Sequence, residues 1–329
     1  MRLLCGDIGG TKTELAIFTG EPGGWACERR KLYASLDFAT FDALLADFRC
    51  ETLDAAGLGA AGPVVDGRCK TTNLPWVLDA TELRARLHAP VGVINDFHAM
   101  ALGVRELGGD DLVVLQEGQR DVDGPVTVLG AGTGFGCAHL PHARAATVLS
   151  TEAGHADLAA PGPWAAGLLD FARRRHARPT VEHLLSGAGL SMVFDHVVDS
   201  GEVDASAELL DAVRTAADPA AVIGERSGRD RACERAVERF VELYGSEAAN
   251  VALRLLPTGG MVIAGGIAAK VLAPFEAGVF VRAFTDKRPM SGLLARIPVS
   301  LALHPSTALL GARVAACMLY SNTAAPSRD

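Results

Sequence analysis

Three glycine clusters that lie far apart along the chain constrain its fold more than any other feature. They are Gly6–Thr11, Gly130–Gly136 and Gly265-Gly266, and each follows directly after a short apolar run. Glycine lets the backbone come close to a phosphate group and turn its N–H donors toward it. One such cluster is typical of a tight hairpin. Three of them, each after an apolar run, favour a nucleotide site assembled from several strand ends.

The turns at these clusters differ from the standard nucleotide fingerprints. The sequence has no G-x-x-x-x-G-K-[ST] run, and residues 130–136 alternate as G-x-G-x-G-x-G, which does not fit G-x-G-x-x-G. The first cluster lies between the apolar runs Arg2–Cys5 and Thr13–Phe18, which predicts a β-hairpin. The run Val126–Leu129 enters the second cluster in the same way. The sequence therefore predicts a weak internal duplication, with one phosphate turn in each half.

Apolar periodicity predicts strands and helices in alternation along the rest of the chain. The expected strands lie at 53–59, 91–94, 261–264 and 298–303, and the expected helices at 41–48, 81–87, 97–107 and 307–319. Residues 164–256 are predicted to be mostly helical, although the polar, alanine-rich part at 202–230 gives the weakest pattern. The predicted fold class is therefore α/β.

Composition excludes several classes of function. A net charge of −8 argues against a nucleic-acid surface, which would need a basic patch. The seven cysteines are scattered and never spaced as C-x-x-C, which predicts neither a disulfide framework nor a zinc site. No apolar stretch approaches the ~20 residues of a membrane span. We therefore expect a cytoplasmic protein without nucleic-acid or membrane partners.

Polar residues beside the glycine turns are candidates for chemistry. Asp7 lies inside the first cluster, where a carboxylate would repel phosphate unless Mg²⁺ intervened. The alternative is that Asp7 stabilises its own turn. Asn95 and Asp96 follow a predicted buried strand, so Asp96 could accept a proton from a sugar hydroxyl while Asn95 holds a neighbouring one. Periodicity alone favours a second alternative, in which either residue is the N-cap of the helix at Phe97.

Further polar residues are of the types that grip sugar hydroxyls. Glu152, His155 and Glu182 are such residues, although in isolation each also fits a structural histidine or a solvated glutamate. Thr72 and Asn73 belong to a polar turn before Trp76. That turn is either a sugar-contacting loop or a tight turn pinned by the indole.

Together these motifs resemble the bacterial glucokinase family of the hexokinase–actin superfamily, from Gly6 to about Gly311. The motifs are GDIGGT at 6–11, TNLPW at 72–76, INDF at 94–97, GAGTGFG at 130–136, EAGH at 152–155, E-x-x-L-S-G at 182–187, AGGI at 264–267 and LLGA at 309–312. Their order and spacing agree with the family as well as their content does.

The resemblance implies a two-lobed, actin-like or hexokinase-like α/β ATPase fold with a cleft between a small and a large domain. The small domain would comprise 1–106 and 305–320, the large domain 107–304, and residues 321–329 a C-terminal tail. The implied activity is phosphorylation of the 6-hydroxyl of glucose by ATP, with Mg²⁺ as cofactor, in a homodimer. Two alternatives stay open. One is a kinase for mannose, fructose or glucosamine, and the other is a catalytically silent sugar sensor.

The resemblance also implies roles for individual residues. Asp96 resembles the catalytic base, and Asp7 the residue on the metal side. The positions that resemble sugar ligands are Asn95, Asp96, Glu152, His155 and Glu182, with Thr72 and Asn73 as additions. Those that resemble ATP-binding positions are Gly6, Asp7, Gly9, Gly10, Thr11, Gly132, Thr133, Gly134, Gly265 and Gly266.

The chain departs from the family pattern at two places. Ala153 stands where the family often has glycine, so an extra methyl is expected in the sugar loop. Residues 287–289 read Lys-Arg-Pro where the family often has Lys-Gly-Arg. The related ROK kinases carry a cysteine-rich zinc motif after the Glu-x-x-His segment, but residues 156–175 contain no cysteine. This favours the zinc-free group.

Overall fold

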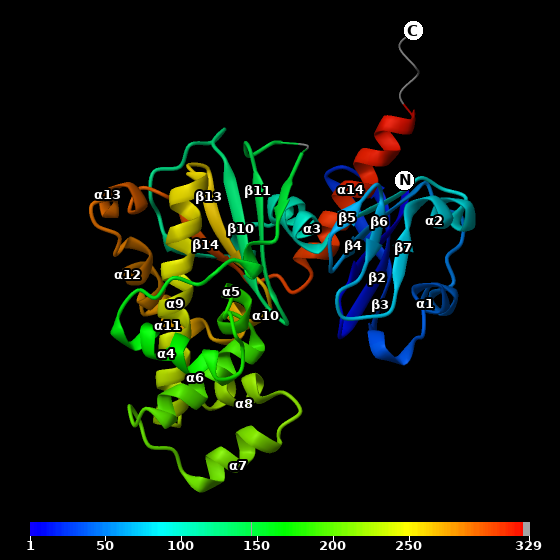
Figure 1. Cartoon of the computed structure of the whole chain (residues 1–329). Coiled ribbons are helices and arrows are strands. Elements are labelled where there is room, and N and C mark those ends of the chain that lie inside the picture. The colour runs from blue at the N-terminus through cyan, green and yellow to red at the C-terminus, as the bar shows by residue number, and fades with distance from the viewer. Residues whose placement is uncertain (146, 325–329) are drawn as a thin grey trace. The chain divides into compact units, whose positions relative to one another are not determined.

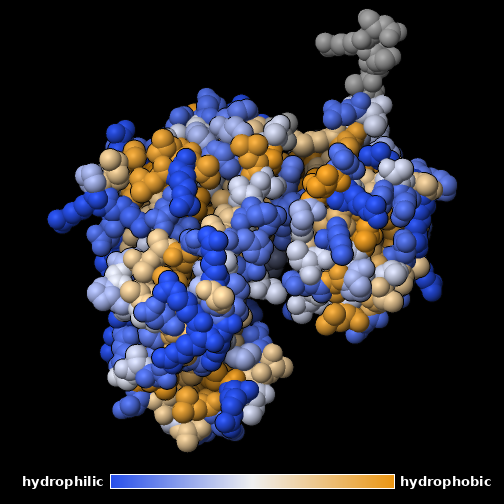
Figure 2. Space-filling view, viewed as in Figure 1, coloured by the Kyte–Doolittle hydropathy of each residue, from blue (hydrophilic) through white to orange (hydrophobic). Residues whose placement is uncertain are grey.

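The computed structural model describes residues 1–145 and 147–324, which form two compact units (Figure 1). The first unit comprises Met1–Gly109, Val148–Ser150 and the described residues from Ser306 onward, and the second comprises Asp110–Thr147 and Thr151–Pro305. No helix in these described ranges is long and apolar enough to cross a bilayer. Figure 2 shows hydrophilic residues over most of the visible surface of each unit, with hydrophobic residues in separate patches.

The first unit is built on a five-stranded sheet of mixed direction. Its strand order is β3 (Gly24–Ala34), β2 (Lys12–Glu21), β1 (Arg2–Ile8), β4 (Ala55–Ala60) and β8 (Val91–Asn95). β1 and β2 pair antiparallel, which confirms the predicted hairpin, whereas β1, β4 and β8 run parallel. A second sheet consists of the short strands β5 (Val64–Val65), β6 (Arg68–Lys70) and β7 (Val77–Asp79).

Alternation of side chains along β1 gives the first unit two hydrophobic layers. Leu4 and Ile8 pack in the layer that contains α1 (Phe41–Phe48) and α2 (Ala80–Leu87). Leu3 and Cys5 point to the opposite face and pack in the layer that contains α14 (Thr307–Ala324). The C-terminal helix therefore covers one face of the N-terminal sheet.

Helix α14 lies in backbone contact with α3 (Asp96–Gly103) in the first unit. A Cβ atom on Gly311 would lie 1.6 Å from the carbonyl oxygen of Ala99, and one on Gly103 would lie 1.8 Å from that of Thr307. Only glycine permits these approaches. α14 extends beyond the predicted 307–319 to Ala324, so the predicted tail at 321–329 begins within the helix. Residues 325–329 lie outside the described residues.

The second unit repeats the central sheet of the first. β11 (Phe135–Leu140), β10 (Val126–Ala131), β13 (Gly260–Ala264) and β14 (Val299–Ala302) follow one another, with an antiparallel pair first and parallel pairs after it. The strands β2, β1, β4 and β8 have the same order and directions. This correspondence confirms the predicted internal duplication. β9 (Leu112–Gln116), which the sequence did not predict, adds an antiparallel edge to β14.

Helices dominate the second unit between residues 163 and 255, as predicted. The α-helices are α4 (Pro163–Arg173), α5 (Val181–Leu184), α6 (Gly187–Asp199), α7 (Ala207–Thr215), α8 (Pro219–Arg226), α9 (Arg231–Leu255), α10 (Gly266–Lys270), α11 (Leu272–Glu276), α12 (Val279–Thr285) and α13 (Ser291–Leu294). The remaining elements are β12 (Leu149–Thr151) and the 3-10 helices η1 (Ser35–Asp37), η2 (Val104–Glu106), η3 (Gly109–Asp111) and η4 (Ala153–His155). Figure 1 shows the long helix α9, in yellow, which packs against α12 and α6.

Candidate active site

The parallel strands of the first unit bring its predicted site residues to one edge of the sheet. Ile8 pairs with Ala60, and Ala60 pairs with Asn95, so β1, β4 and β8 end level with one another. The turn at 9–11 and Asp96 follow two of these strand ends. In open α/β sheets, ligands bind outside the carboxyl ends of the strands. The register thus supports a site at this edge.

Asn95 is the N-cap of α3. Its Oδ1 accepts hydrogen bonds from the backbone N–H groups of Phe97 and His98, at 2.9 and 3.2 Å. Its Nδ2 donates to the carbonyl oxygen of Gly62 at 3.1 Å, which joins the ends of β8 and β4. The N-cap alternative from the sequence therefore holds for Asn95, and one N–H of its amide is left for a ligand.

Asp96 is the first residue of α3 and is half-buried. Its Oδ1 accepts a hydrogen bond from the N–H of Phe97 at 2.9 Å. The helix ends at Gly103 and continues as η2, close to the predicted 97–107. Because Asn95 already caps the helix, Asp96 is not needed as the cap.

Asp7 lies among other carboxylates. It pairs across the β-hairpin with Glu14, a side chain that is 8% exposed and forms an ion pair with Arg30 on β3. Burial, together with the negative charges of Asp96 and Glu14, raises the pKa of the Asp7 carboxyl to about 7. The carboxylate of Asp7 accepts no hydrogen bond from the backbone or side chains of the described residues. This argues against a role for Asp7 in stabilising its own turn. A carboxylate in this environment is suited to binding a cation.

Replacing Asp7 by asparagine should stabilise the metal-free protein at neutral and alkaline pH. The folded-state pKa of about 7 lies above the usual value of about 3.9, so the fold retains a proton that the unfolded chain loses. Wild-type stability therefore falls as pH rises from about 4 to about 7. Asparagine removes this penalty, and we expect a gain of about 1–2 kcal/mol above pH 7 after allowance for solvent screening. Urea unfolding of both proteins at pH 5 and pH 8 measures this gain in stability.

The gain from Asp7→Asn should shrink toward zero as the pH approaches 4. Asp123→Asn, in an exposed loop, is the matched control and should give no comparable gain at any pH. A gain that increased toward acid pH would show that Asp7 is not held in the destabilising environment described above.

The turn at 9–11 is held from two sides within the first unit. Ser35 Oγ donates to the carbonyl oxygen of Gly9 at 2.8 Å. A Cβ atom on Gly10 would lie 2.7 Å from the Cβ of Asn73, so the loop at 72–76 packs on this turn. Gly6 differs from these two glycines because it lies buried within β1, where a Cβ atom would meet Leu58. Packing, and not the turn, accounts for glycine at position 6.

The loop at 72–76 is a tight turn pinned by the indole, which is one of the two interpretations left open by the sequence. Trp76 is 1% exposed, and its Nε1 donates to the carbonyl oxygen of Phe38 at 3.1 Å, so the indole does pin the turn. Thr72 and Asn73 are exposed on the loop that covers Gly10. Their side chains are therefore available to a ligand at the edge of the sheet.

In the second unit, two glycine turns meet at one sheet edge. Gly130 of β10 pairs with Ala264 of β13, so the turn Gly132–Gly134 and Gly265-Gly266 follow neighbouring parallel strands. Gly265 has φ of +90°, and a Cβ atom there would lie 2.5 Å from the carbonyl oxygen of Ala131. Both facts require glycine. Thr133 and Gly266 are exposed, as a phosphate or nucleoside contact would need.

The segment that carries Glu152 and His155 forms η4. Both side chains are more than half exposed, and His155 Nε2 lies 4.0 Å from Glu152 Oε2. The methyl group of Ala153, expected in the sugar loop, instead packs against the hydrophobic core. Gly154 is sterically required, because a Cβ atom would lie 2.3 Å from the carbonyl oxygen of Phe135. The departure from the family pattern at 153 therefore leaves the loop intact.

Glu182 lies on α5 and contacts the second glycine turn. Its Oε2 accepts a hydrogen bond from the N–H of Phe135 at 2.9 Å. This contact argues against the alternative of a solvated helix-start residue. Phe135, Glu14 and Arg30 had no predicted role from the sequence. Only the pairing of Glu14 with Asp7 across a predicted hairpin could have drawn attention to that position.

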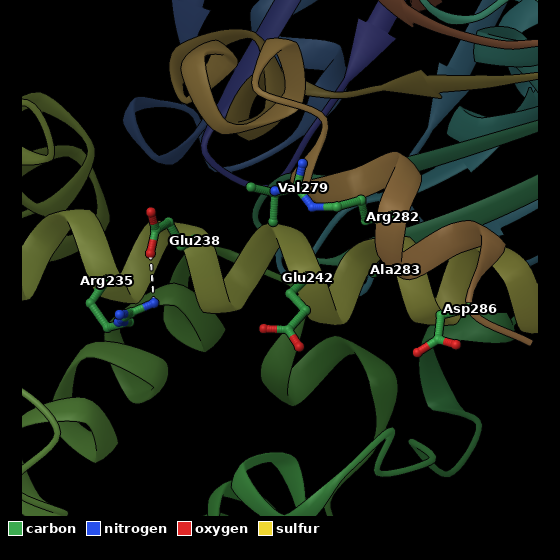
Figure 3. A pocket seen from close by; sticks show the side chains of 7 residues that line it. All are labelled: Arg235, Glu238, Glu242, Val279, Arg282, Ala283 and Asp286. Carbon is green, nitrogen blue, oxygen red and sulfur yellow. Dashed lines mark hydrogen bonds and ion pairs between the residues drawn. The ribbon is translucent and has the colours of Figure 1, made fainter.

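A separate hollow lies between α9 and α12 and encloses about 380 Å³ (Figure 3). Its lining residues are Arg235, Glu238, Glu242, Val279, Arg282, Ala283 and Asp286. None of them is a predicted site residue. Arg235 pairs with Glu238 at 2.8 Å, and Glu242 pairs with Arg239 at 2.9 Å, so several of the charges already have partners. We assign this hollow no role.

Comparisons with known proteins agree with the geometry. The sequence profile of the family described as Glucokinase matches residues 4–318. A glucokinase from Nostoc sp. is 36% identical over 339 aligned residues, which cover 96% of this chain and 99% of the relative. The crystal structure of a glucokinase from an Antarctic psychrotroph superposes with a TM-score of 0.78, at 28% identity, over 96% of this chain and 98% of that one.

A more distant solved structure is that of a ROK family glucokinase from Streptomyces griseus in complex with glucose and AMPPNP. It superposes with a TM-score of 0.69 at 21% identity and covers 97% of this chain and 100% of that one. At this identity the likeness concerns the fold. Taken together, the comparisons confirm the predicted hexokinase-like α/β fold and the family resemblance.

Proposed function

The chain belongs to the glucokinase family, and from this premise we propose that it phosphorylates the 6-hydroxyl of glucose with ATP. The observation that carries the proposal is the arrangement of strand ends. Glycine turns follow β1, β10 and β13, and a carboxylate, Asp96, follows β8. Neither a kinase for another hexose nor a silent sensor is favoured by any observation.

Asp96 acts as the catalytic base in this proposal. Its carboxylate accepts the proton of the 6-hydroxyl as that oxygen attacks the γ-phosphate of ATP. The transition state of phosphoryl transfer is loose, so most of the acceleration comes from positioning and charge stabilisation. The cap formed by Asn95 supports this role, because it fixes the backbone from which Asp96 projects.

Sugar and nucleotide are bound by the remaining predicted residues. The carboxylates of Glu152 and Glu182 accept hydrogen bonds from sugar hydroxyls, and the second amide N–H of Asn95 donates one. The side chains of His155, Thr72 and Asn73 can each accept or donate. Backbone N–H groups at Gly10, Thr11, Thr133 and Gly134 bind the phosphates. The N–H groups of Gly9 and Gly132 instead hold the two turns in shape, because they donate to the carbonyl oxygens of Lys12 and Gly134. Gly265 and Gly266 lie on the adenosine side.

Mg²⁺ is the proposed cofactor, and Asp7 is the residue that would hold it, directly or through water. Bound with ATP, the ion neutralises charge on the transferred phosphoryl group. Within 1–145 and 147–324, no group of three or more His, Cys, Asp or Glu side chains could hold a metal ion by itself. A single carboxylate fits Mg²⁺, which usually keeps several waters and takes its other ligands from substrate phosphates.

The proposal extends to organisation. The two compact units support a small domain of 1–106 with 305–320 and a large domain of 107–304. We also propose a homodimer in the cytoplasm without nucleic-acid or membrane partners, which the family resemblance and the net charge of −8 support. Light scattering after gel filtration tests the dimer.

A coupled assay of ADP release over a panel of hexoses tests the function. We expect glucose to give the highest kcat/KM among glucose, mannose, fructose and glucosamine. EDTA should abolish the activity, and added Mg²⁺ should restore it. A higher kcat/KM for another sugar would identify a different hexokinase, and the absence of ADP release with every sugar would identify a sensor.

A further inference from the structure

One residue in the second unit, Phe135, joins the predicted nucleotide turn to the predicted sugar ligands. Phe135 opens β11 directly after the turn Gly132–Gly134. Its N–H donates to Glu182 Oε2 at 2.9 Å, and its carbonyl oxygen lies 2.3 Å from where a Cβ atom on Gly154 would be. The end of the turn is therefore held between α5, which carries Glu182, and η4, which carries His155.

The turn is fixed to the same segment at its other end. The N–H of Gly187, at the start of α6, donates to the carbonyl oxygen of Gly132 at 2.9 Å. The N–H of Gly132 in turn donates to the carbonyl oxygen of Gly134 at 2.8 Å. A Cβ atom on Gly134 would lie 2.3 Å from Glu182 Oε2. The Glu182 carboxylate thus packs directly on the turn, and any movement of one must move the other.

Building on the proposed function, we propose that Glu182 is a positioning residue that couples glucose binding to nucleotide binding. Oε2 accepts a hydrogen bond from the N–H of Phe135, whereas Oε1 accepts none from the described residues. A sugar hydroxyl on Oε1 restricts the rotation of the carboxylate and so orders the turn before ATP binds. Because coupling between two ligands is reciprocal, ATP on the turn also strengthens glucose binding.

The test measures the affinity for each ligand with and without the other, because the ratio of the two affinities is the coupling, and this ratio should fall toward one in Glu182→Ala. The affinities for single ligands report how the contact between Glu182 and the turn orders each site. Glu182→Ala removes the acceptor for the Phe135 N–H, so it should weaken binding of Mg-AMPPNP about fivefold or more without any glucose present. Glu182→Gln keeps an acceptor oxygen and should bind Mg-AMPPNP within about twofold of wild type. Glu152→Ala, on a sugar residue with no contact to the turn, should also leave this affinity unchanged.

The reciprocal variant changes the turn and measures the sugar. Gly134→Ala places a methyl against Glu182 Oε2, so it should weaken glucose binding about fivefold or more without nucleotide. The matched control is Gly132→Ala in the same turn, where a Cβ atom meets nothing within 4 Å. Its glucose affinity should equal that of wild type. Thermal melting of every variant establishes that it is folded, and calorimetry gives the affinities.

The outcomes distinguish this inference from the proposed function. Wild-type protein that binds neither glucose nor Mg-AMPPNP would overturn the function. Normal wild-type binding, with Mg-AMPPNP affinity unchanged in Glu182→Ala and glucose affinity unchanged in Gly134→Ala, would overturn the coupling alone. Glu182 would then be a sugar ligand that happens to touch the turn.

Discussion

Asp96→Asn should lower the turnover number at least about 100-fold while the fold persists. Asparagine matches aspartate in size but cannot take the proton of the sugar hydroxyl. The amide oxygen can still accept the hydrogen bond from the N–H of Phe97, and Asn95 continues to cap α3. The coupled ADP assay measures turnover, and urea unfolding measures stability.

Asn95→Ala is the comparison variant for Asp96→Asn, because it should lower the stability that Asp96→Asn leaves unchanged. Loss of the cap should cost about 1 kcal/mol of stability. It also removes the link from Asn95 to Gly62. If Asp96→Asn kept near-normal turnover, the carboxylate would be a structural group and the proposed base would have to be sought elsewhere.

Gly311→Ala should destabilise the first unit by about 3 kcal/mol, the upper end of the usual cost of overpacking. The new methyl would lie 1.6 Å from the carbonyl oxygen of Ala99, a backbone atom of α3 that cannot rotate away. The two helices must therefore separate. Because Asp96 is the first residue of α3, activity should fall together with stability. Urea unfolding and the ADP assay report the two effects.

Gly292→Ala is the matched control for Gly311→Ala. Gly292 lies in α13, and a Cβ atom there meets nothing within 4 Å. Alanine suits a helix better than glycine by about 0.5–1 kcal/mol, so this variant should be as stable as wild type or slightly more stable. Equal stability of Gly311→Ala and wild type would contradict the close approach of α14 to α3.

Local sequence signals were sufficient for much of the fold. The bounds of α1 agree with the predicted helix at 41–48, because its apolar residues repeat at helical spacing. Both hairpins were predicted from glycines between apolar runs. β3 was not predicted, because this edge strand is largely exposed and carries charged residues without a clear alternation. It pairs with β2 across the short turn at residues 22–23, so the signal that was missed is a local one, the Pro22-Gly23 turn.

The residues of the candidate site could be predicted from the sequence, but the hydrogen bonds among them could not. Local periodicity could not decide whether Asn95 or Asp96 caps α3, since both residue types suit that position. The hydrogen bond between Glu182 and Phe135 joins residues 47 positions apart in sequence. Such a contact depends on how α5 packs against the turn. No spacing rule would have indicated it.

The position of α14 has a consequence for how the chain matures on the ribosome. The layer of the first unit that contains Leu3 and Cys5 is completed by Leu309, Ala312 and Ala316. During synthesis, this face of the sheet stays uncovered until α14 has left the exit tunnel. The second unit, which ends at Pro305, is complete before that moment. β1 is therefore made before the second unit but fully buried only after it, and its uncovered face is open to aggregation during this interval.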